Sequence, residues 1–190
     1  MALYFVTKEV GTYCNIILQS IFQVLMRNLL FLIFASLLLF SCGKTQKPKT
    51  IYIVRHAEKQ LEGSDPDLLQ VGKIRAKKLA QILEGEGIKH VFSTDYTRTR
   101  NTALPTAEAA GVEIELYDPR NQGELVEKLR SLEGNVLVVG HSNTVNQLAN
   151  YFVGNGEKYP DLSDIEYDFI FVVTMDENGE KVERKLYKDF

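Results

Sequence analysis

Two short apolar runs constrain the fold of this chain more than any other part of its sequence. They occupy residues 51–54 and 136–139 and are rich in valine and isoleucine. Runs of this length and composition are typical of strands that are buried on both faces of a sheet. The segments between them carry apolar residues at steps of three and four, so predicted helices alternate with predicted strands. The sequence therefore predicts an α/β fold around a mostly parallel central sheet.

The remaining elements complete this pattern after residue 50. Asn178-Gly179 indicates a C-terminal hairpin, because this dipeptide is typical of tight turns between two strands. Strands that alternate with helices and end in a hairpin predict a three-layer α/β/α sandwich. The expected strands are 50–55, 90–93, 112–117, 135–140, 169–175 and 181–187, and the expected helices are 67–84, 97–110, 122–132 and 143–153.

Length and charge limit the classes of protein to consider. The chain has 190 residues, which suffices for one α/β domain with a core of its own. Its hydrophobic content of 45% and charged content of 25% are ordinary for a globular protein. The net charge of −3 gives no overall basic field, so we expect no nucleic acid partner, and any anion site must be local.

The N-terminal part of the chain has a different composition. Residues 29–40 are apolar almost without interruption, and Arg27 supplies a positive charge in front of them. This length suits the core of a signal peptide better than a membrane span, which needs about 20 residues. Met26 is an alternative to Met1 as the start of the chain, because residues 1–25 show no coherent pattern of their own.

The apolar run ends in Ser41-Cys42-Gly43, which resembles a bacterial lipobox. At such a motif a signal peptidase cuts before the cysteine, and the cysteine is acylated. A plain signal peptide with an incidental cysteine and a retained anchor helix are the other interpretations. Each buried acyl CH₂ contributes about 0.8 kcal/mol, so more than one chain gives stable anchoring. We therefore expect a lipid anchor at Cys42, in the bacterial cell envelope and facing outside the cytoplasm.

These features divide the chain into three parts. We expect an N-terminal extension with a lipoprotein-type signal peptide at 1–41, a short basic linker at 42–49 and the globular domain at 50–190. Both cysteines, Cys14 and Cys42, precede that domain. The domain can therefore hold neither a disulfide nor a thiolate metal site.

Arginine and histidine residues follow the two apolar runs directly. Arg55 and His56 come after the first run, and His141 closely follows the second. Ligands of open α/β sheets bind beyond the carboxyl ends of the strands, so these side chains are expected at one site. A neutral imidazole can attack phosphorus when its other nitrogen is hydrogen-bonded, and guanidinium matches phosphate oxygens bidentately. The three residues predict a cationic pocket with a nucleophile, suited to an anionic substrate.

Two further segments are expected to border the same pocket. Residues 93–103 follow a predicted strand and open a helix, on which Arg98 and Arg100 are about 200° apart. Only one of these two arginines can point at the pocket. Residues 140–144 form a strand-to-helix turn, and we expect the helix that follows to aim its N-terminal amides at the same space.

Together these segments resemble the histidine phosphatase superfamily, the group with the phosphoglycerate-mutase-like fold. Arg55-His56-Ala57 is similar to its Arg-His-Gly signature, with alanine in place of glycine. Residues 93–103 resemble its pattern of serine, arginine five residues later and then Thr-Ala, which selects Arg98 as the inward arginine. Gly140-His141 resembles its second histidine motif. The resemblance covers residues 50–190, which are identified as a histidine phosphatase domain. The chain is especially similar to small members of the superfamily that begin Arg-His-Ala-Glu.

The resemblance implies a two-step phosphoryl transfer. His56 attacks the phosphoryl group and becomes phosphohistidine, while Arg55, Arg98 and His141 hold the phosphoryl oxygens and offset the developing charge. Water then releases inorganic phosphate. No metal and no other cofactor is required. The implied catalytic residues are His56 and His141, and the implied phosphate-binding residues are Arg55 and Arg98.

The residue that protonates the leaving group is the open point. Acid phosphatases of the superfamily carry an aspartate directly after the second histidine, where this chain has Ser142. Mutase-type members carry a glutamate in an insertion after the third strand, where this chain has only residues 117–122. Asp118, at the end of a predicted strand, and Glu58, next to the first motif, are the candidates. Without a placed acid we expect a good leaving group or a slow phosphatase, and no mutase activity.

The sequence thus predicts a lipid-anchored, metal-independent phosphatase that acts outside the cytoplasm on a small phosphorylated substrate. A protein phosphohistidine phosphatase is one alternative, because the compact outline resembles that branch. A catalytically silent phosphate-binding lipoprotein is the other. His90 and Tyr167 are expected to be structural, and residues 60–66 and 154–164 carry no readable pattern.

Overall fold

The computed structural model describes residues 22–29 and 47–190, which fall in two compact units, Met1–Thr45 and Gln46–Phe190. In the first unit, residues 22–29 are helical. Most of the predicted signal segment, together with Cys42, lies outside the described residues. Within the two described ranges, no helix is both long enough and apolar enough to cross a membrane.

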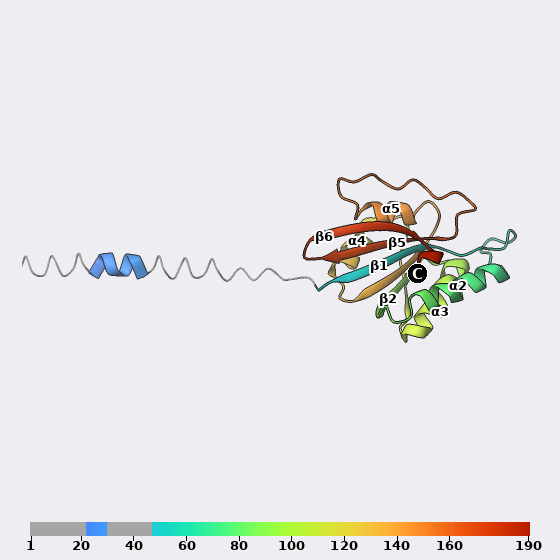
Figure 1. Ribbon diagram of the computed structural model, residues 1–190, viewed down its shortest axis with the longest axis horizontal. Coiled ribbons are helices and arrows are strands. Elements are labelled where there is room, and N and C mark those ends of the chain that lie inside the picture. The colour runs from blue at the N-terminus through green and yellow to red at the C-terminus, as the bar shows by residue number, and fades with distance from the viewer. Residues whose placement is uncertain (1–21, 30–46) are drawn as a thin grey trace, which may run out of the picture. The chain divides into compact units, whose positions relative to one another are not determined.

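The unit Gln46–Phe190 is built on a six-stranded sheet in the order β3-β2-β4-β1-β5-β6 (Figure 1). The first four strands in this order are parallel, and the β5–β6 hairpin adds two antiparallel strands at one edge. The two most apolar strands, β1 and β4, pair with each other in the middle of the sheet, as predicted. The strands are β1 (Lys49–Arg55), β2 (Ile88–Ser93), β3 (Ile114–Leu116), β4 (Asn135–Gly140), β5 (Phe169–Asp176) and β6 (Gly179–Leu186).

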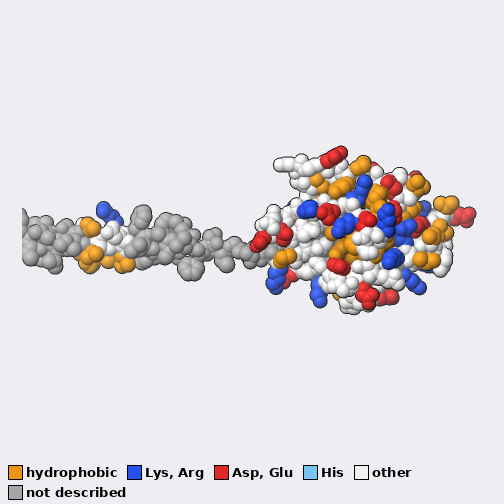
Figure 2. Space-filling view, viewed as in Figure 1, with side chains coloured by type: hydrophobic (Ala, Val, Ile, Leu, Met, Phe, Trp, Pro, Cys, Tyr) orange, Lys and Arg blue, Asp and Glu red, His pale blue; other side chains and the backbone are white. Residues whose placement is uncertain are grey.

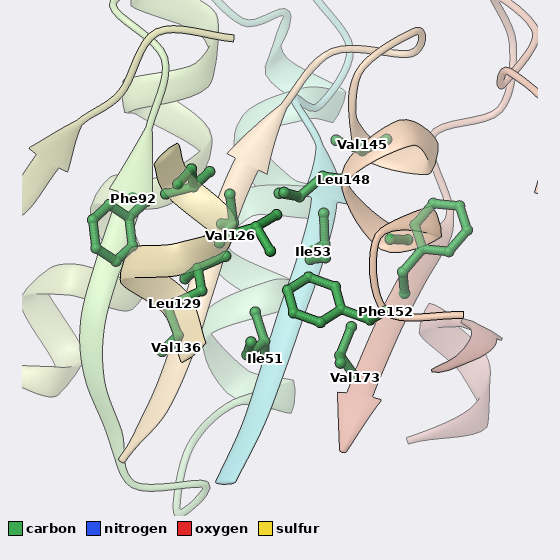
Figure 3. Packing of buried hydrophobic residues seen from close by; sticks show 14 of the residues in the cluster. Ile51, Ile53, Phe92, Val126, Leu129, Val136, Val145, Leu148, Phe152 and Val173 are labelled. Carbon is green, nitrogen blue, oxygen red and sulfur yellow. The ribbon is translucent and has the colours of Figure 1, made fainter. Parts of the chain in front are cut away.

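Helices cover both faces of this sheet, so the predicted three-layer α/β/α sandwich is confirmed. Alternate side chains of a strand point to opposite faces. Ile51 and Ile53 of β1 pack in the core with α4 and α5, whereas Tyr52 and Val54 pack in the core with α2 and α3. Figure 3 shows the first of these cores. The helices are α2 (Gln70–Ile82), α3 (Thr97–Ala110), α4 (Gln122–Ser131), α5 (Val145–Asn150) and the short 3₁₀ helix η1 (Tyr187–Asp189).

The surface of this unit mixes charges of both signs. Figure 2 shows Lys and Arg side chains interspersed with Asp and Glu side chains over the visible face. No single-sign field covers this face, in keeping with the small net charge of −3.

Helix α2 begins at Gln70, three residues later than its apolar pattern predicts. The residues before it are extended and bond to the segment that follows β1. Gln60 N donates to Asp67 O at 2.8 Å, and Leu69 N donates to Glu58 O at 2.9 Å. Because these backbone groups are engaged across the two segments, the chain turns into a helix only after them. The extended residues before α2 therefore hold the segment that follows β1 in place through backbone hydrogen bonds.

Helix α5 spans six residues, fewer than the predicted 143–153. The N–H groups of Tyr151 and Phe152 bond to Leu148 O and Ala149 O, three residues back, at 3.2 and 3.0 Å. Bonds of this spacing tighten the last turn and end the helix. Strand β3 is likewise reduced to three residues at the edge of the sheet, where it has a single neighbouring strand.

The predicted linker at 42–49 ends in a residue that belongs to the sheet. Lys49 is the first residue of β1 and is buried. Its Nζ donates hydrogen bonds to Leu129 O at 2.6 Å, Arg130 O at 2.8 Å and Leu132 O at 2.6 Å. The last carbonyl groups of a helix have no partners within it. Lys49 therefore caps the C-terminal end of α4.

Candidate active site

The parallel pairing of β1 and β4 brings the two predicted histidines together. The register places Arg55 opposite Gly140, and a histidine follows each of them. His56 N donates to Gly140 O at 2.9 Å. The ring centres of His56 and His141 lie 5.6 Å apart, with 67° between the ring planes. The ends of β1 and β4 thus bring together the residues that the sequence predicts at one site.

The ring of His56 is held in one tautomer. Its Nδ1 lies 2.8 Å from Ala57 O. Because a carbonyl oxygen only accepts, Nδ1 carries the hydrogen and Nε2 keeps its lone pair. The backbone of Ala57 is fixed in turn, since its N–H donates to Thr102 Oγ1 at 2.9 Å, and the Thr102 hydroxyl donates to Arg98 O at 2.7 Å. Helix α3 therefore sets the position of the His56 ring.

His56 is uncharged at neutral pH. Its pKa is lowered from 6.5 to about 3. Burial is the largest cause, because removing the ring from water disfavours its charged form. The hydrogen bond to Ala57 O opposes this shift, and the nearby charges of Arg55 and Arg98 add to it. The site thus holds a neutral imidazole.

His141 is held in the opposite tautomer. Its Nδ1 lies 3.5 Å from Arg98 Nη2, and its Nε2 lies 3.0 Å from Thr94 Oγ1. Since guanidinium only donates, Nδ1 accepts and the ring hydrogen of the neutral form is on Nε2, facing the Thr94 hydroxyl. The pKa of His141 is lowered to about 4, first by burial and then by the charges of Arg98 and Arg55. Both histidines are therefore neutral in the free site.

Arg55 reaches the site from the end of β1 and is buried. Its Nη1 donates to Ser163 O at 2.8 Å and to Glu166 O at 3.1 Å. Its guanidinium carbon lies 4.1 Å from the centre of the Tyr167 ring. Its Nε is buried and has no hydrogen-bond partner among the described residues. One edge of the guanidinium is anchored, and the Nε–H remains a free donor.

Of the two arginines in the predicted helix, Arg98 faces the site and Arg100 does not. The Arg98 side chain is 15% exposed and lies beside His141, whereas the Arg100 side chain is 39% exposed and pairs with Asp95. This is the separation expected for positions about 200° apart on a helix. Arg98 Nε is also buried without a partner among the described residues. A buried cationic donor without a partner is costly unless an anion binds it.

Glu58 is tied to Arg75 of α2. Arg75 Nη2 lies 2.7 Å from Glu58 Oε1, and Arg75 Nε lies 3.0 Å from both carboxylate oxygens. Burial favours the neutral acid, but the hydrogen bonds and charge of Arg75 outweigh it and hold the pKa of Glu58 below its usual value. The geometry makes Glu58 an ionised anchor between the His56 segment and α2.

Asp118, the other candidate acid, is exposed and paired with its neighbour Arg120. Arg120 Nε and Nη2 donate to its two oxygens, both at 3.0 Å. These hydrogen bonds lower the pKa of Asp118. Neither candidate carboxyl is held in the protonated form that a general acid needs.

Three further residues lie at the site although the sequence analysis does not name them as site residues. Tyr167, which we expected to be packing at the core or an edge, has its ring centre 6.1 Å from that of His56 and lies against Arg55. The Tyr96 ring stands perpendicular to the His141 ring at 5.0 Å. Asp65 lies 3.6 Å from Arg98 Nη1 and accepts from the N–H and hydroxyl of Thr97. Tyr96 could have been found from its place two residues before Arg98; the other two come from loops.

Two of the amides at the start of α5 are engaged within the turn that carries His141. The N–H groups of Thr144 and Val145 both donate back to His141 O at 3.0 Å. His141 N itself donates to Thr144 Oγ1 at 3.0 Å. These hydrogen bonds hold His141 in place at the end of β4, before the six-residue helix begins.

The third histidine lies apart from this cluster. His90 Nε2 is 3.2 Å from Glu133 O, on the loop before β4. Across residues 22–29 and 47–190, no group of three or more His, Cys, Asp or Glu side chains is arranged to hold a metal ion.

Comparison with known proteins agrees with this geometry. The sequence profile described as "Histidine phosphatase superfamily (branch 1)" matches residues 51–119. "Probable phosphoglycerate mutase GpmB" of Serratia proteamaculans (strain 568) is 39% identical over 90 residues, 42% of this chain and 41% of the relative. The protein of the same name from Escherichia coli O1:K1 / APEC is 34% identical over 129 residues, 60% of this chain and 58% of the relative. The matched part thus spans about half the length of these relatives.

A solved structure shares the fold over nearly its whole length. The protein histidine phosphatase SixA complexed with tungstate has a TM-score of 0.62 and 20% identity, and the match covers 74% of this chain and 98% of that one. The profile and the relatives resemble this chain over part of its length, in agreement with the motifs, and the solved structure shows that the fold is shared.

Proposed function

We propose that this domain is a metal-independent phosphatase that hydrolyses a small phosphorylated substrate through a phosphohistidine intermediate on His56. One observation carries the proposal. A buried neutral imidazole, with its Nδ1–H bonded to Ala57 O, stands beside Arg55 and Arg98, whose Nε–H donors lack partners among the described residues. An uncharged nucleophile next to free cationic donors suits an incoming phosphoryl group.

In the first step, the Nε2 lone pair of His56 bonds to phosphorus as the bond from phosphorus to the leaving oxygen breaks. The ring becomes positive, and its Nδ1–H bond to Ala57 O strengthens, because charged donors make stronger hydrogen bonds. Arg55 and Arg98 stabilise the charge on the equatorial oxygens. A leaving oxygen that needs a proton takes it from solvent.

In the second step, water attacks phosphorus, the phosphorus–nitrogen bond breaks, and its electron pair returns to Nε2 of His56. A proton of the attacking water passes to solvent, and inorganic phosphate leaves. The negative charge of the phosphoryl group raises the pKa of His141 and so favours its protonation. Protonated at Nδ1, His141 becomes a donor to a phosphoryl oxygen rather than an acceptor from Arg98.

The test is hydrolysis of p-nitrophenyl phosphate by the full chain in a mild detergent with a chelator present. We expect turnover by the parent and by His90→Ala, and none by His56→Ala. Samples quenched in base should contain acid-labile phosphohistidine in the parent and in His90→Ala, and none in His56→Ala. His90→Ala is the matched control, because it removes an imidazole outside the cluster.

The opposite result has a definite meaning. If the parent does not turn over any ester but binds inorganic phosphate in a calorimeter, the phosphatase proposal fails. The chain would then be the phosphate-binding lipoprotein without turnover.

A protein phosphohistidine phosphatase is the second candidate. The observation that favours it is the short connection from β3 to α4, only residues 117–121, which leaves the side of the site open. A phosphorylated imidazole on a partner protein can approach an open site, and imidazole leaves with little help from an acid. A higher kcat/KM for a phosphorylated histidine-phosphotransfer domain than for free phosphohistidine would support this candidate, and equal values would remove it.

We also propose that acylation of Cys42 holds the domain at a bacterial membrane, outside the cytoplasm. The motif Ser41-Cys42-Gly43 after an apolar run supports this anchor. The test is metabolic labelling with radioactive palmitate in a bacterial host. We expect label and membrane fractionation for the parent, and loss of both for Cys42→Ser. Cys14→Ser is the matched control and should retain both.

A further inference from the structure

An open groove adjoins the histidine pair and has no part in the proposed chemistry. Its volume is about 700 Å³, and its lining comes from Asp95-Tyr96 at the start of α3 and from the chain between Leu116 and Arg120. Tyr96 belongs to both sites, because its ring stands edge-on to His141 at 5.0 Å. The Tyr96 ring therefore lies between the groove and the histidine pair.

Two loops bound the cluster on other sides. Arg55 is bonded to the carbonyl groups of Ser163 and Glu166, and Asp65 lies beside Arg98. A substrate whose phosphoryl group lies between these arginines can extend past His141 into the groove. The groove is thus placed to hold what remains of the substrate after the phosphoryl group is removed.

The charged groups that line the groove are paired with one another or with a neighbour. Asp118 accepts two hydrogen bonds from Arg120, and Asp95 pairs with Arg100. These charges form a polar rim, and each is paired in the free domain.

Beside this rim the groove presents apolar and aromatic side chains. Leu116 is 55% exposed and Tyr96 is 39% exposed, and Pro119 also lines the groove. The Tyr117 hydroxyl is turned to Val139 O at 3.3 Å, so this residue offers the groove its ring rather than its polar end. Exposed apolar side chains with a polar rim are typical of binding surfaces.

The leaving-group chemistry points the same way. Both candidate acids, Glu58 and Asp118, are engaged by arginines. A leaving group that is stable without a proton is therefore favoured, and an oxygen attached to an aromatic ring has this property, because its negative charge spreads into the ring. We infer that the groove is the leaving-group subsite and takes a planar aromatic ring, so that the substrate class is a phosphoryl group carried on such a ring. This inference rests on the proposed phosphatase function.

The test compares two substrates on the full chain in a mild detergent. 1-Naphthyl phosphate carries a planar aromatic ring that the groove has room for, and acetyl phosphate has a good leaving group without a ring. We expect Leu116→Asn to raise KM for 1-naphthyl phosphate by about fivefold, the loss of part of one apolar contact, and to leave acetyl phosphate unchanged. Leu116→Phe should preserve both values. Leu104→Asn, which replaces a leucine 43% exposed on α3 outside the groove, is the matched control.

Each outcome decides the inference. Equal changes in KM for the two substrates, or no change for either, would overturn the aromatic subsite while leaving the phosphatase intact. If the parent hydrolyses neither substrate, the proposed function fails, and calorimetric titration with 1-naphthyl phosphate decides on the groove. Weaker binding to Leu116→Asn than to the parent supports the subsite, and equal binding overturns it.

Discussion

The Thr102 hydroxyl connects the proposed nucleophile to the arginine that faces it. It accepts from Ala57 N at 2.9 Å and donates to Arg98 O at 2.7 Å. The carbonyl that orients His56 and the backbone that carries Arg98 therefore move together. Short backbone links of this kind hold two groups in position better than two long side chains can. The first turns of α3 thus set the position of the His56 imidazole relative to the Arg98 guanidinium.

The first prediction separates the two arginines of this helix. We expect Arg98→Ala to lower kcat/KM for an aryl phosphate by about 100-fold or more, because a donor that stabilises the transition state is lost. Arg100→Ala should change it by less than about threefold, since an exposed ion pair contributes little. Steady-state kinetics on the two purified variants checks this. Equal losses would show that both guanidinium groups reach the phosphoryl group.

At the scale of elements, α2 packs directly on the backbone that follows the nucleophile. A Cβ added to Gly72 would lie 2.2 Å from Glu58 O, which is closer than two such atoms can approach. Glycine at this position therefore lets the helix come close, and the ion pair from Arg75 to Glu58 closes the same contact at 2.7 Å. The packing of α2 and the position of His56 depend on each other.

The second prediction tests this contact. We expect Gly72→Ala to lower the free energy of unfolding by about 2 kcal/mol, because α2 must shift away, and to lower kcat as the His56 segment moves. Gly123→Ala is the matched control. A Cβ there meets no atom within 4 Å, and alanine favours the helix. Urea denaturation and kinetics on both variants check this, and a Gly72→Ala protein as stable and active as the control would contradict it.

The third prediction concerns the end of α4. We expect Lys49→Met to lower the free energy of unfolding by about 2–4 kcal/mol, because three carbonyl groups at the end of the helix lose their donor. Lys47→Met is the matched control, since its ion pair with Glu133 is exposed, with 78% of each side chain accessible. Urea denaturation should show no measurable change for this control. Similar stability for the two variants would mean that water replaces Lys49 as the cap.

For the molecule as a whole, the sequence predicts the strands and helices, whose apolar residues follow a regular pattern. It does not predict where loop residues lie. Residues 51–54 of β1 and 136–139 of β4 form apolar runs, as expected where both faces of a strand are buried, and these runs indicate the centre of the sheet and the position of His56 and His141. The predicted helix at 97–110 coincides with α3, since Gly111 supplies the left-handed residue that ends it, with φ 66. Periodicity and turn chemistry suffice for these features.

The loops could not be predicted in the same way. Asp65 and Tyr167 reach the site from segments without a period, and their positions follow from long-range hydrogen bonds and ring contacts. The bond from Asp65 to Thr97 spans 32 positions in the sequence. The surroundings of Glu58 show the same limit, because its closeness to His56 in the sequence does not reveal Arg75, which binds the Glu58 carboxylate.

Burial of two neutral histidines ties the stability of the whole domain to pH. In the unfolded chain each ring has its ordinary pKa of 6.5, whereas in the folded domain His56 has a pKa of about 3 and His141 of about 4. Above pH 6.5 both rings are neutral in either state and contribute no pH dependence. As the pH falls below 6.5, the unfolded chain takes up protons that the folded domain refuses, so stability falls until the folded pKa values are reached.

The fourth prediction is the size of this effect. Between pH 7.5 and pH 5, each histidine should remove about 2 kcal/mol from the free energy of unfolding. Urea denaturation of the parent and of the double variant His56→Asn/His141→Asn at the two pH values measures it. We expect a steeper loss in the parent, because the variant has no ring to protonate. Inorganic phosphate should reduce this loss in the parent alone, since a bound anion favours the protonated imidazoles. Equal losses in parent and variant, with or without phosphate, would mean that the folded site already accepts these protons.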